Sequence, residues 1–190
     1  MENDRVAMKV ASLLLQYPDE HLRDMIMEIR NQIEDAPSSD FRNACQDLMD
    51  FLKEGSMVQI QEVYTQTFDL SANTSLYLTY HKWGESKERG ENLLRLRQTY
   101  RKAGYEPLPA ELPDYLPLVL EFFSIAPEGL FQTVWHEIGL PLERIGCALE
   151  RKGSPYGRLV RALYHMLEEK GGTIDPKSYD RDCSAREGHS

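Results

Sequence analysis

Cysteine is scarce in this sequence, with only three residues among 190. Cys45, Cys147 and Cys183 stand far apart. An odd number of cysteines at such spacings supports neither a disulfide framework nor a zinc cluster. The scarcity therefore predicts a reduced, cytoplasmic protein that holds no metal of its own.

Long hydrophobic runs are also missing. The longest stretch without a charged side chain runs from Leu70 to His81, which is too short and too polar to cross a bilayer. The first residues, Met-Glu-Asn-Asp-Arg, lack the basic and apolar regions of a secretory signal. We therefore expect no direct insertion into a membrane.

The sequence lacks the motifs that mark common enzyme chemistries. It contains no GxxxxGK[ST] loop, no GxGxxG turn and no GxSxG elbow. His136-Glu137 resembles half of a zinc-protease motif, but the position four residues after His136 holds Leu140 instead of a second histidine. These absences predict that the protein is not an enzyme.

Positive charge is in short supply, and the net charge is −9. An acidic balance disfavours binding to nucleic acid or to an anionic membrane surface. Residues 105–150 carry eight acids and a single base, Arg144, which gives this stretch a charge of −7. The stretch either attracts a basic partner or is a solvated face that serves solubility, and charge alone leaves both readings open.

Helical periodicity dominates what is present. Apolar residues recur at intervals of three and four, as in Leu22, Met25, Ile26, Ile29 and Ile33. No segment alternates apolar and polar residues with the period of two that a half-buried strand requires. The sequence therefore predicts an all-α, single-domain bundle of six to eight helices.

Proline, glycine and capping residues predict where the helices begin and end. Asp19 is a cap for the second helix, and Ser39 or Asp40 opens the third. Residues 75–103 form one long helix or two that meet near Gly84. The helical pattern ends at Gly171, which predicts a folded domain over 1–170 and a flexible tail over 171–190. Further breaks are expected at 17–18, 36–39, 55–56, 104–111, 125–127 and 153–155.

Residues 111–122, Glu-Leu-Pro-Asp-Tyr-Leu-Pro-Leu-Val-Leu-Glu-Phe, form an unusual stretch. A proline suits the first turn of a helix, so the regular helix is expected to start near Pro117. Asp114 then lies near the positive end of the helix dipole. The stretch is either a rigid, capped helix start or an acidic corner beside apolar side chains that accepts a basic amphipathic segment.

Two further stretches precede it. Tyr64, Phe68, Tyr77 and Tyr80 fall at helical intervals within residues 64–81, where core packing explains most of the pattern and tyrosines also suit binding surfaces. Residues 89–100 are rich in arginine, which indicates a solvated helix face whose bases pair with acids elsewhere.

These stretches, in this order, resemble the NarJ family of nitrate reductase molybdenum cofactor assembly chaperones, within the TorD-like redox-enzyme maturation proteins. The similarity covers roughly residues 5–170. The residues that carry it are Leu13-Leu-Leu-Gln-Tyr-Pro18, Tyr64-x-x-x-Phe68-Asp69, Ser75-Leu-Tyr-Leu-Thr-Tyr-His81, Arg89-Gly90 with Leu93, Leu94, Leu96, Tyr100 and Gly104, and Glu111-Leu-Pro-Asp-Tyr-Leu-Pro117 with Leu120-Glu121-Phe122.

The resemblance implies a cytoplasmic chaperone with a single helical domain. Such a protein binds the N-terminal segment of the nitrate reductase alpha subunit and holds the apo-nitrate reductase until its molybdenum cofactor is inserted, before docking to the membrane. The cofactor is handled on the client, and none is bound permanently by the chaperone. The alternatives are a TorD-type or DmsD-type chaperone for another twin-arginine molybdoenzyme, or a plain protein-binding adaptor.

A helix-in-groove mode of recognition suits a basic, apolar client segment. The expected contact residues are Leu76, Tyr80, His81, Glu111, Asp114, Tyr115, Leu116, Leu120, Glu121 and Phe123. In this scheme Asp114 meets a basic client residue, so its replacement by asparagine weakens binding and leaves the melting temperature nearly unchanged. Replacing Leu120 by alanine tests whether that side chain belongs to the core or to the groove.

Overall fold

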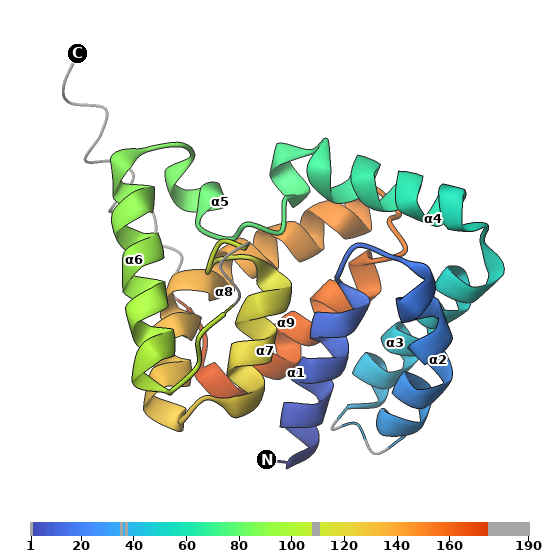
Figure 1. Cartoon of the computed structure of the whole chain (residues 1–190), viewed down its shortest axis with the longest axis horizontal. Helices are drawn as coiled ribbons and strands as arrows, with labels where there is room; N and C mark the ends of the chain where they lie inside the picture. Colours follow the sequence, from blue (N-terminus) through green and yellow to red (C-terminus); the bar gives the residue numbers. More distant parts are fainter. Residues whose placement is uncertain (1, 35, 37, 108–110, 175–190) are drawn as a thin grey trace.

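The chain folds into helices, as Figure 1 shows. The computed structural model describes residues 2–34, 36, 38–107 and 111–174. Over these residues the all-α class is confirmed, and nine α-helices occur where six to eight were expected, because a four-residue helix is among them. The α-helices are α1 (Glu2–Leu14), α2 (Glu20–Gln32), α3 (Ser39–Glu54), α4 (Met57–Tyr64), α5 (Tyr80–Trp83), α6 (Lys87–Lys102), α7 (Leu116–Ile125), α8 (Glu128–Arg151) and α9 (Gly157–Gly171).

Several helix boundaries follow from local capping. The Asp19 carboxylate accepts a hydrogen bond from the Leu22 backbone N–H at 2.8 Å and caps α2, as predicted. Ser38 caps α3, one residue before the expected start. Ser56 and Gln59 form a reciprocal capping box at the start of α4. Pro117 lies in the first turn of α7, where its missing N–H leaves no helical bond unmade.

The region between α4 and α6 departs from simple helical periodicity. After Tyr64 the chain leaves the α-helical pattern of α4 and continues as one π-helical turn, η1 (Thr65–Asp69). A short 3₁₀ turn, η2 (Ala72–Thr74), follows, and residues 75–79 are not helical. Gly84 has φ of +54°, a conformation that favours glycine, and it separates α5 from α6.

Helix α7 lies in the middle of the fold against α1, and α9 packs on α8 and α3 (Figure 1). The Ser12 hydroxyl of α1 donates a hydrogen bond to the Pro117 carbonyl oxygen at 2.6 Å, which joins segments 105 residues apart in sequence. In Figure 1, α2, α3 and α4 lie to one side of this centre, with α5 and α6 on the other.

The last described residues follow helix α9. Helix α9 ends at Gly171, and Ile174 just beyond it is buried. The rest of the predicted tail, residues 175–190, lies outside the described residues. None of the helices in the described part of the chain is long and apolar enough to span a membrane.

Candidate functional site

Two of the segments singled out by the sequence pair with each other, although α6 separates them along the chain. The Leu116 backbone N–H donates to the Leu76 carbonyl oxygen at 2.9 Å, and the Leu78 N–H donates to the Asp114 carbonyl oxygen at 3.0 Å. Tyr77 and Tyr115 form an antiparallel bridge between them. We call this pairing of 76–78 with 114–116 the 77–115 bridge. This bridge explains why residues 75–79 are not helical, because backbone groups of Leu76 and Leu78 form hydrogen bonds with residues far along the chain.

Asp114 is fully buried beside this bridge. Its Oδ2 accepts hydrogen bonds from the Thr79 backbone N–H at 3.1 Å and from the Thr79 hydroxyl at 2.5 Å. The Arg89 guanidinium lies 3.4 Å from the same oxygen and also donates to the Thr79 hydroxyl at 3.2 Å. The positive partner expected from a client is therefore a residue of this chain. In this structure Asp114 fastens α6 to the 77–115 bridge and faces no solvent.

Four apolar residues that were expected to line a groove are also buried. Their side chains are at most 2 % exposed, and they are Leu76, Leu116, Leu120 and Phe123. Helix α7 is apolar on nearly every side, and such a helix is enclosed by its neighbours instead of presenting one face to a ligand. In this structure these side chains form core, and a peptide on the surface reaches none of them.

A surface groove lies next to the bridge, on the side of α5 and η1. Its volume is about 580 Å³. Two exposed leucines line it, Leu70 with 76 % of its surface accessible and Leu112 with 40 %. Tyr80 was predicted to contact the client and does line this groove. The lining residues are Asp69, Leu70, Ser71, Ala72, Ser75, Tyr77, Tyr80, Glu85, Arg89 and Leu112.

Three tyrosines, Tyr77, Tyr115 and Tyr64, contact one another beneath the groove surface. The Tyr77 hydroxyl lies 3.3 Å from the Glu111 carboxylate, and the Tyr77 and Tyr115 rings pack with their centroids 5.4 Å apart. The Tyr115 and Tyr64 hydroxyls are 3.1 Å apart, and Tyr64 donates to the Leu15 carbonyl oxygen at 3.1 Å. Burial and the neighbouring Glu111 raise the pKa of Tyr77 to about 12, so this hydroxyl stays a donor. The predicted residues Glu111 and Tyr115 thus hold Tyr77, which lines the groove.

The groove carries acidic charge. Asp69 and Glu85 line it, and Glu111 lies directly behind Tyr77. The one base among the lining residues is Arg89, whose charge is matched by the buried Asp114 and whose guanidinium lies over the Tyr80 ring at 5.6 Å. The exposed leucines and the half-buried tyrosines therefore lie beside three carboxylates, a surface suited to a segment that is apolar and basic.

Two predicted residues lie elsewhere. Glu121 is exposed on α7 and accepts a hydrogen bond from the Tyr105 hydroxyl at 2.8 Å. His81 lines a different pocket, and its Nε2 lies 2.8 Å from the Ser75 carbonyl oxygen. Burial lowers the pKa of His81, and the nearby Arg144 adds to this effect, while the bond to Ser75 opposes it.

Sequence reasoning missed most of the groove. Asp69 and Arg89 were noted as parts of motifs, but neither was selected as a contact residue, and Leu70, Tyr77, Glu85 and Leu112 were not selected either. The structure marks this region with a π-helical turn that ends at Asp69, beside Leu70, and such turns often occur at functional sites. The turn has no sequence signature here.

Metal-binding side chains do not converge in the described part of the chain. Nowhere in it do three or more His, Cys, Asp or Glu residues come together as a possible metal site. Cys45 is buried, and burial raises the pKa of its thiol to about 12, so it is an inert core residue.

The helical fold is shared with a solved structure. A protein from Archaeoglobus fulgidus assigned as a redox enzyme maturation protein matches with a TM-score of 0.63 and 25 % sequence identity, over 86 % of this chain and 93 % of that one. The fold is therefore that of a maturation protein.

The chain belongs to the nitrate reductase delta subunit family, whose model matches residues 34–160. The protein named probable nitrate reductase molybdenum cofactor assembly chaperone NarJ of Bacillus subtilis is 32 % identical over 88 % of this chain and 91 % of its own length. NarJ of Escherichia coli strain K12, named as the same kind of chaperone, is 30 % identical over 85 % of this chain and 69 % of its own. These relatives are named as assembly chaperones and not as catalysts, and we class this chain as an assembly chaperone and not an enzyme.

Proposed function

We propose that this protein is a nitrate reductase chaperone that binds the N-terminal segment of the alpha subunit in the acidic groove. It holds the apo-nitrate reductase while the molybdenum cofactor is inserted, and the cofactor stays on the client throughout. The observation that carries the proposal is the pairing of exposed Leu70 and Leu112 with the carboxylates of Asp69 and Glu85 in one groove. The names of the NarJ relatives support the choice of client.

Apolar burial would supply most of the affinity in this groove. Covering exposed leucine and tyrosine surface contributes about 25 cal/mol per Å². The carboxylates would orient the segment by meeting its lysine or arginine side chains at the rim, where charge governs encounter and register more than final affinity. The free cysteines Cys45 and Cys147 fit a reducing compartment, so the proposal places the chaperone in the cytoplasm.

Calorimetric titration with synthetic N-terminal peptides from several molybdoenzyme catalytic subunits tests the proposal. The nitrate reductase alpha peptide is expected to bind with a 1:1 stoichiometry and at least tenfold more tightly than the others. Equal affinity for all peptides, or preference for another enzyme's peptide, would contradict the choice of client. Molybdenum cofactor recovered on the client after co-purification distinguishes a maturation chaperone from an adaptor.

Truncating Leu70 to alanine is expected to weaken binding of the alpha-subunit peptide about fivefold, because roughly 1 kcal/mol of apolar contact is lost. The melting temperature should stay within a degree, because the Leu70 side chain is mostly solvent-exposed. Titration and a thermal melt measure the two quantities. Leu94→Ala is the matched control, an exposed leucine on α6 that does not line the groove and should change neither. Equal losses from both variants would place the peptide elsewhere.

Raising the salt concentration from 0.05 to 0.5 M (roughly a threefold shorter Debye length) is expected to slow association of the peptide more than it speeds dissociation. The carboxylates at the groove act on the encounter with a basic segment, and added ions screen them. Stopped-flow mixing at several ionic strengths measures both rates. An association rate that is independent of salt would show that Asp69 and Glu85 serve solubility alone.

A further inference from the structure

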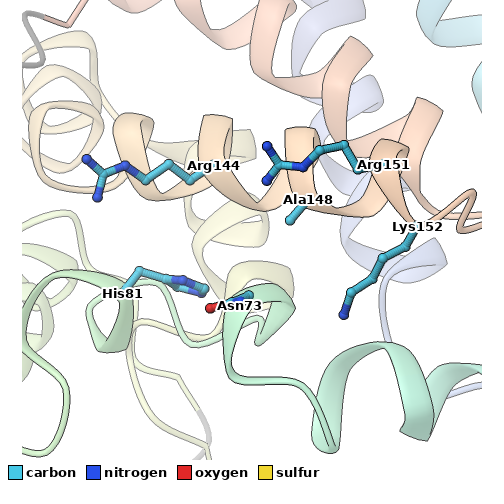
Figure 2. Close-up of a pocket in the computed structure, with 6 residues that line it drawn as sticks. All are labelled: Asn73, His81, Arg144, Ala148, Arg151 and Lys152. Carbon is cyan, nitrogen blue, oxygen red and sulfur yellow. The ribbon is translucent and has the colours of Figure 1, made fainter.

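A second pocket opens on the other side of residues 70–81, between this segment and α8, and Figure 2 shows it. Its volume is about 530 Å³, within the range of small-molecule sites. The lining residues are Asn73, His81, Arg144, Ala148, Arg151 and Lys152. None of them is acidic, although the chain as a whole carries a net charge of −9.

The wall formed by α8 has a regular construction. Arg144, Ala148 and Arg151 follow one another at intervals of four and three residues and therefore share one face of the helix. Figure 2 shows the short Ala148 side chain between the two arginines. The small residue leaves open the space that a longer side chain would fill. Arg144 is also the single base within the acidic residues 105–150.

The opposite wall supplies polar groups. His81 comes from α5 and Asn73 from η2, and Figure 2 shows their side chains across from α8, pointing toward each other. The Lys152 ammonium group donates to the Ser71 hydroxyl at 2.7 Å and ties the end of α8 to this wall. Because the Ser75 carbonyl can only accept a hydrogen bond, His81 carries a proton on Nε2. The wall therefore offers the Asn73 amide to a ligand, while the Nε2–H of His81 is already bound to Ser75.

We propose that this basic pocket binds the phosphate group of a small phosphorylated molecule. Guanidinium forks match the oxygens of a phosphate and bind them with two parallel hydrogen bonds, and lysine adds a point charge. Three cationic side chains line the described part of the pocket, and this charge suits a group that carries about two negative charges better than a single carboxylate. The pocket exceeds the size of phosphate alone, so the rest of the ligand occupies the remaining volume.

The pocket is separate from the acidic groove. Ser71, Ser75, Tyr77 and Tyr80 line the groove, whereas Asn73 and His81 of the same segment line the pocket. One segment thus separates two sites of opposite charge. This inference therefore does not depend on the identity of the client.

Titration calorimetry of the full chain with inorganic pyrophosphate, at constant ionic strength, tests the proposal. Saturable 1:1 binding is expected. Arg151→Gln removes one guanidinium, and Ala148→Leu fills the space without changing charge, so each should weaken binding at least fivefold. Arg101→Gln is the matched control, because Arg101 also lies in the last turn of a helix and is distant in sequence from the pocket lining. It should change the affinity less than twofold.

A second readout locates the ligand. In NMR spectra the ring signals of His81 should move during the pyrophosphate titration, while those of the exposed His21 on α2 stay in place. Absence of saturable binding would overturn the proposal. So would equal losses from Arg151→Gln and Arg101→Gln, full binding by Ala148→Leu, or a polyglutamate peptide that binds as tightly as pyrophosphate.

Discussion

Replacement of Asp114 by asparagine is expected to lower the free energy of unfolding by about 3 kcal/mol, the scale for breaking a buried ion pair. The change leaves the Arg89 guanidinium, whose side chain is 17 % exposed, without its anionic partner. The asparagine amide can take two orientations. In one, its NH₂ group faces the Thr79 N–H, so two donors oppose each other. In the other, the NH₂ group takes the Oδ1 position, where the buried carboxylate oxygen has no hydrogen-bond partner. Urea denaturation measures the loss.

Glu121→Gln is the matched control for this variant. It also neutralises a carboxylate, but Glu121 is exposed on α7. The amide oxygen of the introduced glutamine can still accept a hydrogen bond from the Tyr105 hydroxyl. A change of less than about 0.5 kcal/mol is expected. The sequence alone predicted the reverse for Asp114, weaker peptide binding with unchanged stability. If Asp114→Asn melts like the wild type, the buried pair with Arg89 contributes nothing to stability.

Truncation of Leu120 to alanine is expected to cost about 2–5 kcal/mol, because the side chain is completely buried and its removal leaves a cavity in the core. This loss is a large part of the stability of an ordinary domain, so the variant should melt many degrees lower. Peptide affinity, measured at a temperature where the variant is folded, should equal that of the wild type, since Leu120 does not line the groove.

Leu94→Ala serves as the comparison for Leu120→Ala. Its side chain is 62 % exposed on α6, and alanine has the highest helix propensity, so stability should change by less than about 0.5 kcal/mol. If the Leu120 variant keeps its stability and loses peptide binding, the groove lies over α7, and the sequence-based hypothesis is restored in place of the one argued from the structure.

Features set by neighbours in sequence were predictable here. Asp19 caps α2 through a hydrogen bond three residues away, and Pro117 begins α7 because proline suits the first helical turn. The predicted breaks at 125–127 and 153–155 also occur, because α7 ends at Ile125 and α9 begins only at Gly157. Residues 75–79 could not be assigned correctly, because their backbone is held by 114–116, and nothing in the intervening sequence encodes that pairing.

The candidate site was less accessible to sequence reasoning. A stripe of leucines at helical intervals has the same pattern whether it lines a groove or a core, so the sequence could not show that Leu116 and Leu120 are buried. The charge of Asp114 suggested an external partner, because its true partner, Arg89, lies 25 residues earlier on another helix. Tyr80, one of the expected contact residues, does line the groove, and tyrosines often combine apolar area with a polar tip at binding surfaces.

The contact between α1 and α7 has a consequence for folding during synthesis on the ribosome. Translation proceeds at about 5–20 residues per second, so roughly 5–20 s pass between the synthesis of Ser12 and that of Pro117, 105 residues later. During this time the apolar face of α1, which includes Met8, Val10 and Leu14, has no α7 to cover it. The nascent chain thus exposes an amphipathic helix, the kind of segment that cellular holdases bind.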